Sequence, residues 1–368
     1  MWRKGMLCLL LATAACRFEY DDGKDKQPPQ QHPAQASASP TVDPLAARDP
    51  APGAPADPKL ADDQPRPVMQ LQVVLDRLGF TPGVVDGENG MSTRNAVAGF
   101  QESRGLPVTG DVDAATRQVL AQWSNIPATR VVTIPADFAA GPFQPTPPRP
   151  EDQAKLPQLG YQSLAEKLAE RFHTKPETLL ALNARPAGSD FQAGDRLRVP
   201  NVGADRIDPA AVSDAKWRAT LATLGVGSAQ PRADRVVVSK SRGTLKAYDS
   251  ADRLIAMYTA TMGSAHDPLP LGRWKVVGVA HNPDFAFNPD LLWDVPDSAE
   301  KQRLPPGPNG PVGVVWIDLD KPHYGIHGTP EPSTIGRAQS HGCVRLTNWD
   351  AARLAQMVHA GTKVLFEA

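Results

Sequence analysis

Apolar residues at helical spacing mark the first part of the chain that the pattern predicts to be folded. Leu71, Val74, Leu75 and Leu78 fall on one face of a helix, and Gly79 would end it. A glycine directly after the last apolar position is a common helix stop, because it adopts the left-handed conformation without strain. The pattern therefore predicts an amphipathic helix that packs its apolar face against other elements.

Two more helices are predicted shortly afterwards. The stretch STRNAVAGFQES predicts a helix with Ser92 as its N-cap and Phe100 on its buried side. The stretch GDVDAATRQVL predicts a third helix before Trp123. Together they predict a small three-helix domain over residues 67–124.

A second compact block is predicted over residues 158–203. SLAEKLAERFHTKPETLLALN predicts two short amphipathic helices that separate near Thr174. FQAGDRLRVPNV then predicts a turn and a strand. No strand is evident directly before Tyr161.

Residues 233–368 alternate short β-rich runs with turn signals, which is typical of a mostly-β domain. One helix is expected near the end, because Thr347 and Asp350 form the start of a capping box before WDAARLAQMV. GTKVLFEA then predicts a closing strand. The fold class predicted for the whole chain is multidomain α+β: a three-helix domain, a small α/β module and a C-terminal mostly-β, sandwich-like domain.

Proline changes the picture between these blocks. The chain has 38 prolines in 368 residues, about twice the usual ~5%. Many fall in residues 17–66, a Pro- and Ala-rich stretch with too few large apolar side chains to form a core, so we expect a disordered tether there. Residues 137–157 are expected to form a second linker. With 39 basic and 40 acidic residues, the net charge of −1 gives no electrostatic case for a nucleic-acid partner.

The first sixteen residues read as an export signal. Arg3 and Lys4 precede a short apolar run that is too short to span a bilayer, which needs ~20 residues. Cys16 follows small residues, which resembles the lipid-attachment site of bacterial lipoproteins; cleavage after Ala14 is the alternative. Both interpretations predict an exported protein of the periplasm or cell envelope, with membrane contact only through an N-terminal lipid at Cys16.

Cys343 is the one cysteine outside this signal. An unpaired cysteine in an exported protein is a candidate reactive thiol, since exported proteins usually pair their cysteines. If SHGCVRL is extended, His341, Cys343 and Arg345 share one face, while Val344 and Leu346 point into the core. A thiol beside a histidine and an arginine has its pKa lowered by the positive surroundings.

The residues alone leave three interpretations of Cys343 open. It could be an inert buried thiol. It could bind zinc together with His327 and His341. It could be a nucleophile activated by the nearby histidine, the arrangement of cysteine enzymes.

Two segments resemble known wall-binding modules. Asp86, Gly87, Gly90 and Thr93 match the D-G-x-x-G-x-x-T loop of peptidoglycan-binding domains with three helices, over residues 67–124. Residues 158–203 resemble a degenerate LysM-like carbohydrate-binding module, although a packing spacer is an equal alternative. These resemblances imply a glycan partner for the exported protein.

Residues 327–348 resemble the signature of the L,D-transpeptidase catalytic domain, often called YkuD-like. The family pattern is an H-G pair, a gap, then [ST]-H-G-C-[IV]-R and a nearby Asn. The matching positions are His327, Gly328, Ser340, His341, Gly342, Cys343, Val344, Arg345 and Asn348. The resemblance covers residues 233–368 and implies an enzyme that joins the stem peptides of peptidoglycan, without a cofactor or metal.

The same resemblance implies roles for these residues. Cys343 would attack a donor tetrapeptide and form an acyl-thioester, and His327 would accept the thiol proton. The backbone N–H groups of Gly342 and Cys343 would face the oxyanion. His341 would shape the site.

Other matched residues would support or bind the substrate. Ser340 would support the loop and Gly328 would lie in the substrate-binding region. Arg345 would hold a substrate carboxylate or form a structural ion pair. Water as the acceptor would make the enzyme a carboxypeptidase or an amidase, and a non-catalytic wall-binding scaffold is a third alternative.

Residues 281–310 are predicted to be a long loop. Loops of this length are uncommon unless they are functional. Phe285, Phe287 and Trp293 are expected to cap the donor site, with simple packing over the sheet as the alternative.

Overall fold

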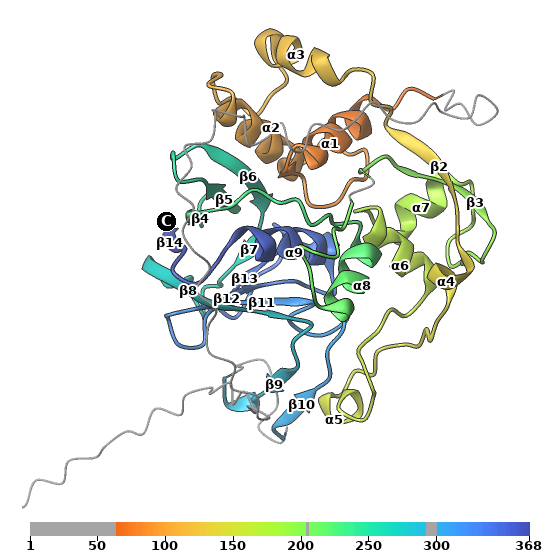
Figure 1. Ribbon diagram of the computed structural model, residues 1–368, viewed down its shortest axis with the longest axis vertical. Helices are drawn as coiled ribbons and strands as arrows, with labels where there is room; N and C mark the ends of the chain where they lie inside the picture. The colour runs from red at the N-terminus through yellow and green to blue at the C-terminus, as the bar shows by residue number, and fades with distance from the viewer. Residues whose placement is uncertain (1–63, 204–205, 292–299) are drawn as a thin grey trace, which may run out of the picture.

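The computed structural model describes residues 64–203, 206–291 and 300–368 (Figure 1). The export signal with Cys16, nearly all of the predicted tether and Trp293 lie outside these ranges. Within them, no helix is long and apolar enough to cross a membrane. The multidomain α+β fold class is confirmed: a helical N-terminal region precedes a large, mostly-β C-terminal domain.

The N-terminal domain contains the three predicted helices. They are α1 (Pro67–Arg77), α2 (Met91–Ser103) and α3 (Ala114–Leu120), with the short strand β1 (Phe80–Thr81) and the 3-10 turn η3 (Ala121–Trp123). Gly79 follows α1 with a φ of 85°, the left-handed conformation expected of a helix stop. The N-cap prediction for α2 is wrong. Gly90 occupies that position in an extended conformation, and Ser92 lies inside the first turn.

The second module is built around a strand that the sequence did not reveal. β2 (Thr129–Thr133) pairs antiparallel with β3 (Arg196–Pro200), and the helices α6 (Leu164–Arg171) and α7 (Pro176–Leu182) lie between them in the chain. The Pro-rich linker is inserted directly after β2, with the short helices α4 (Ala136–Ala139) and α5 (Pro150–Gln153).

The C-terminal domain forms most of one large sheet. The strand order is β1-β6-β5-β4-β14-β8-β11-β12-β13-β7. Helix α8 (Ala215–Leu224) precedes the sheet and α9 (Asn348–Met357) packs on it, and both contribute to a core with residues such as Trp217 and Trp349. The remaining strands and turns are β4 (Arg235–Ser239), β5 (Thr244–Tyr248), β6 (Leu254–Thr259), β7 (Thr261–Met262), β8 (Gly272–His281), β9 (Phe285–Phe287), η4 (Pro289–Leu291), β10 (Gln302–Leu304), β11 (Val315–Leu319), β12 (Gly325–His327), η5 (Pro332–Thr334), β13 (Val344–Arg345) and β14 (Lys363–Glu367).

The helical domain and the C-terminal sheet are joined, as Figure 1 shows at the contact of α2 with β6. β1 adds to the sheet edge as a parallel partner of β6, with Phe80 opposite Met257. Gly99 of α2 lies so close to Met257 that an added Cβ would meet its side chain at 3.0 Å. Phe80 and Met257 are both fully buried in one apolar cluster. The two domains therefore share one apolar core and are not independent units joined only by a linker.

A buried ionic cluster joins all three parts of the chain. Asp76 of α1 accepts two hydrogen bonds from the guanidinium of Arg353 on α9, each 3.0 Å long. The Nδ1 atom of His173, which follows α6, lies 3.1 Å from the same carboxylate. Asp76 and His173 are almost fully buried. Because each residue comes from a different part, the cluster fixes their relative positions.

Two more buried polar contacts reinforce this junction. Asn348, the first residue of α9, donates a 2.8 Å hydrogen bond to Glu170 of α6. Thr81 of β1 donates a 2.8 Å hydrogen bond to Asp350 of α9. Helix α9 therefore contacts both N-terminal parts through residues next to the segment that carries Cys343.

Candidate active site

Cys343 lies at the end of a bent loop and not within a strand. Residues 341–343 form bends, and strand β13 contains only Val344 and Arg345. The condition that SHGCVRL is extended is therefore not met over residues 341–343. The reason is Gly342, which has a φ of 95° and therefore does not adopt the extended backbone of a strand. Val344 and Leu346 are fully buried, as predicted, and Cys343 is partly exposed.

Gly342 is required by its neighbour as well as by its backbone angle. A Cβ atom at this position would lie 2.7 Å from the ring of Tyr324. Burial raises the pKa of the Tyr324 hydroxyl, and the nearby Cys343 and Asp267 raise it further. The tyrosine ring thus lies against the turn that presents the thiol, and the Sγ atom of Cys343 lies 3.7 Å from the carbonyl oxygen of His323.

Ser340 fixes the other end of this turn. Its buried hydroxyl donates a 2.6 Å hydrogen bond to the carbonyl oxygen of Cys343 and accepts one of 2.6 Å from the backbone N–H of Gly263. The backbone N–H of Ser340 also donates to the Gly263 carbonyl at 3.2 Å. The hydroxyl and the backbone N–H of Ser340 therefore both hold the loop to Gly263, the residue that follows β7.

His327 is held on the strand next to Cys343. Strands β12 and β13 run parallel, with His327 opposite Arg345. The imidazole is buried, and its Nδ1 atom lies 2.7 Å from the carbonyl oxygen of Gly328. A carbonyl can only accept, so the proton must reside on Nδ1, and Nε2 then carries the lone pair. The ring of Trp316 stacks on the imidazole with centroids 5.6 Å apart.

The electrostatic environment keeps His327 neutral. Burial lowers its pKa, and the positive charge of Arg345 lowers it further, to about 3. The hydrogen bond to Gly328 acts in the opposite direction but is the weakest of the three influences. At neutral pH the group is therefore a free imidazole with its acceptor nitrogen available.

Gly328 has a packing role in this geometry. Its carbonyl orients His327, and an added Cβ would collide with the side-chain oxygen of Asn348. That oxygen accepts a 3.3 Å hydrogen bond from the N–H of Val314. The H-G pair of the sequence pattern thus combines an oriented histidine with the close approach of Asn348.

The zinc interpretation finds no geometric support. Across the ranges that the structure describes, no three His, Cys, Asp or Glu side chains gather closely enough to hold a metal ion. His327, His341 and Cys343 all fall in those ranges. His341 and Arg345 are partly exposed on the segment around the thiol.

The expected long loop of residues 281–310 is instead partly a β-hairpin. β9 and β10 pair antiparallel, with Phe287 opposite Gln302. Phe287 is buried with Leu159 and Leu304, and Phe285 packs at the edge of this small cluster. Phe287 therefore packs against Leu159, just after the linker, and not over the face of the sheet as the packing alternative had it; the hairpin lies beside the end of the linker (Figure 1). Phe285 and Phe287 were predicted to cap a substrate, which sequence alone could not distinguish from a contact with Leu159.

Comparisons with known proteins agree with the motifs. Residues 233–365 match the model of the "L,D-transpeptidase catalytic domain" (YkuD). Residues 64–120 match that of the "Putative peptidoglycan binding domain".

Several curated proteins are similar to the chain. A protein of Bacillus licheniformis named "Putative L,D-transpeptidase YkuD" is 29% identical over 199 residues, which cover 54% of the chain and 90% of the relative. Its namesake in Bacillus subtilis is 53% identical over 57 residues, or 16% of the chain and 35% of that protein. Among solved structures, the catalytic domain of an L,D-transpeptidase from E. faecium aligns with 36% of the chain and 95% of its own length, at 19% identity and a TM-score of 0.29.

Proposed function

We propose that the chain is an L,D-transpeptidase and that Cys343 is the nucleophile with which it transfers stem peptides of peptidoglycan. Its residues 233–365 match the YkuD catalytic domain, and residues 64–120 match a peptidoglycan-binding domain. The Cys343 thiolate attacks the carbonyl carbon of the L,D-bond that precedes the terminal D-Ala of a donor tetrapeptide. The C–N bond breaks, D-Ala leaves, and the donor stays on the sulfur as a thioester. An acceptor amine then attacks the thioester and regenerates the thiol.

The orientation of His327 is the observation that carries this proposal. Because its Nδ1–H group donates a hydrogen bond to the carbonyl of Gly328, the imidazole presents Nε2 as a base. It takes the Cys343 proton and returns it to the departing amine. Burial and Arg345 keep the imidazole neutral before the reaction. Because both also oppose its protonation, the negative charge of the thiolate has to stabilise the imidazolium that forms.

The turn around Gly342 supports the remaining roles. The backbone N–H groups of Gly342 and Cys343 are the proposed oxyanion donors, because a fixed turn can aim them where negative charge develops. Ser340 holds that turn against Gly263. Partly exposed Arg345 is suited to a substrate carboxylate, and the proposed role of His341 is to shape the site.

Product analysis with purified disaccharide-tetrapeptide tests the reaction. The wild-type protein should form cross-linked dimers and release D-Ala, and Cys343→Ala should form neither. His327→Ala should slow the reaction by about 100-fold or more, since a positioned acid–base group contributes 10²–10⁴. Release of disaccharide-tripeptide without dimers would show that water is the acceptor and would support the carboxypeptidase alternative.

The two matched domains both act on peptidoglycan, which indicates the cell envelope as the place of action. We propose further that residues 1–16 are an export signal and that Cys16 receives a lipid. Mass spectrometry of the N-terminal peptide from envelope fractions tests this. A diacylglyceryl-modified Cys16 supports it, and an unmodified N-terminus at Ala15 supports simple cleavage after Ala14.

A further inference from the structure

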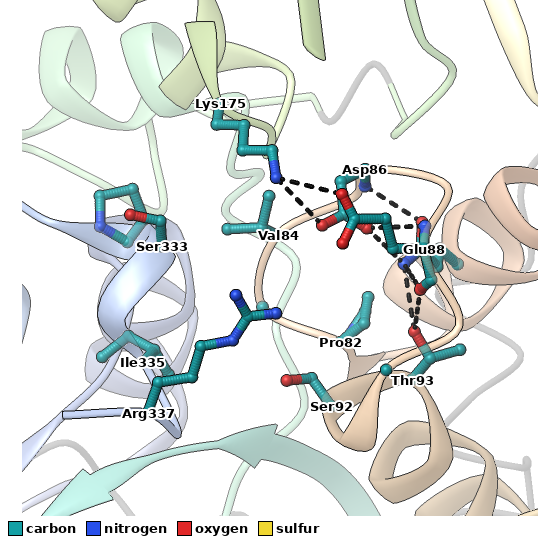
Figure 2. A pocket seen from close by; sticks show the side chains of 14 residues that line it. Pro82, Val84, Asp86, Glu88, Ser92, Thr93, Lys175, Ser333, Ile335 and Arg337 are labelled. Carbon is teal, nitrogen blue, oxygen red and sulfur yellow. Dashed lines mark hydrogen bonds and ion pairs between the residues drawn. The ribbon is translucent and has the colours of Figure 1, made fainter. Parts of the chain in front are cut away.

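A pocket lies where the three parts of the chain meet (Figure 2). One wall is the segment from Pro82 to Thr93 in the peptidoglycan-binding domain, a loop and the start of α2. Lys175, just before α7, forms the second wall. The third wall is the segment from Pro332 to Arg337 in the catalytic domain. The pocket thus belongs to the assembled protein, since no single part contains it.

The acidic groups of this pocket already have partners. Asp86 and Glu88 each lie 3.5 Å from the ammonium of Lys175. Asp86 also accepts a 3.1 Å hydrogen bond from Gln72. These contacts offset part of the negative charge on this wall and fix it to α1 and to the residue before α7.

Polar groups on two of the walls remain available: Arg337 and Ser333 on the catalytic-domain segment, and Ser92 on the wall of the peptidoglycan-binding domain. Figure 2 shows the Arg337 side chain reaching from its loop toward the space between Ser92 and Lys175. Among the residues that the structure describes, none forms an ion pair or hydrogen bond with the Arg337 guanidinium or with the hydroxyls of Ser92 and Ser333. The surroundings of Gly90 are open, because an added Cβ would meet no atom within 4 Å.

The Arg337 segment is connected to the thiol by fixed contacts. Ile335 is buried, and the backbone N–H of Gly336 donates a 2.8 Å hydrogen bond to the hydroxyl of Thr261 on β7. Ser340 holds the next part of the loop to Gly263, just after the same strand. A ligand bound by Arg337 would therefore rest on the loop that ends in Cys343.

We propose that this pocket binds a carboxylate of a peptidoglycan stem peptide, at a position separate from the thiol. A guanidinium offers two parallel N–H donors that match a carboxylate, and the two serine hydroxyls can add further hydrogen bonds. Stem peptides carry carboxylates, and one wall of the pocket belongs to the matched peptidoglycan-binding domain. The choice of ligand rests on the proposed function, because it assumes that wall material is the substrate.

Binding of the full mature chain to purified peptidoglycan sacculi tests the pocket. All proteins carry Cys343→Ala, so that no turnover occurs, and the comparison is between that protein and its Arg337→Ala, Arg337→Lys and Arg242→Ala derivatives. Arg242 is another exposed arginine and lies outside the pocket. A second set of sacculi has its carboxylates converted to amides.

Arg337→Ala should weaken binding to untreated sacculi about tenfold or more, the loss expected for a charge-assisted hydrogen bond. Arg337→Lys should bind with intermediate affinity and Arg242→Ala should bind like the parent. On amidated sacculi the parent and Arg337→Ala should bind equally. Equal binding of Arg337→Ala to untreated sacculi, or an equal loss on amidated sacculi, would overturn the proposal.

A separate readout distinguishes this inference from the proposed function. Thioester formation is followed by mass spectrometry on proteins that retain Cys343. If the thioester forms but Arg337 does not affect binding, the reaction stands and the pocket fails. If binding depends on Arg337 and carboxylates but no thioester forms, the pocket stands and the proposed reaction fails.

Discussion

Replacing Asp76 by Asn tests whether the three parts of the chain form one cooperative unit. The substitution preserves shape but removes the negative charge that Arg353 and His173 share. Asp76 is fully buried, and its pKa is held far below the usual range by Arg353 and His173 although burial opposes this. Without that charge the guanidinium of Arg353, only 5% exposed, loses its main partner.

Breaking a buried ion pair from one side costs about 3–5 kcal/mol, because the remaining charge stays buried. Asp350 reduces this loss of stability, since its carboxylate lies 3.6 Å from the Arg353 guanidinium and can pair with it. Its pKa is raised to about 7, mainly by burial and partly by Asp76, so removal of Asp76 favours its ionised form. We therefore expect the lower end of the range, about 3 kcal/mol, and a fall in Tm of roughly 6–12 °C.

Thermal and urea unfolding, followed by far-UV circular dichroism and tryptophan fluorescence, measure this loss. A matched control is Asp152→Asn, which breaks the exposed pair with Arg149 and should leave the unfolding curve unchanged. Adding Arg353→Met to Asp76→Asn should recover part of the stability, because the guanidinium is then no longer buried without its main partner. A Tm equal to the wild type, or independent unfolding of the N-terminal parts in the wild type, would refute the reasoning.

Three further predictions concern the loop and its support. Gly342→Ala should slow thioester formation about 100-fold, because the left-handed turn and the Tyr324 ring both exclude a Cβ; stopped-flow acylation with unchanged Tm checks this, and a normal rate would contradict it. Ser340→Ala should slow acylation about tenfold through loss of two hydrogen bonds to the turn, and an unaltered rate would remove Ser340 from the mechanism. Burial raises the pKa of Glu170 to about 8, so between about pH 5 and 8 the native state keeps a proton that the unfolded state has lost, and stability should fall as the pH rises. In urea titrations Glu170→Gln should flatten this dependence of the unfolding free energy on pH, and an identical dependence would contradict the assignment.

Local signals could be predicted well from the sequence. The cap of α9 is confirmed, because the hydroxyl of Thr347 accepts the hydrogen bond from the N–H of Asp350 within four residues. The stop at Gly79 is local in the same way. The prediction for Ser92 failed by two residues, since Gly90 adopts the extended cap conformation in its place. Such small shifts depend on how the helix packs and not on the cap residue alone.

Features that depend on distant partners could not be predicted. β2 was missed because its partner β3 lies beyond two helices and a Pro-rich insertion. The buried junction joins Asp76 to residues 97 and 277 positions away, and nothing in the local sequence marks such a contact. The bend at Cys343 was missed because a glycine in SHGCVRL permits both an extended and a left-handed backbone.

The motif residues predicted the site's chemistry more closely than its geometry. The tautomer of His327 depends on the carbonyl of Gly328, and the approach of Asn348 depends on the missing side chain of that glycine. The pair H-G marks both positions, but only the structure shows that the second residue orients the first.

Intact-protein mass spectrometry after incubation with disaccharide-tetrapeptide, followed by peptide mapping, tests the central claim most directly. The account predicts a covalent adduct with the mass of the donor minus its terminal D-Ala, located on Cys343 and reversed by an acceptor amine. Cys343→Ala should carry no adduct. Dimer formation by the Cys343→Ala protein, or an adduct mapped to any other residue, would contradict the assignment of Cys343 as the nucleophile.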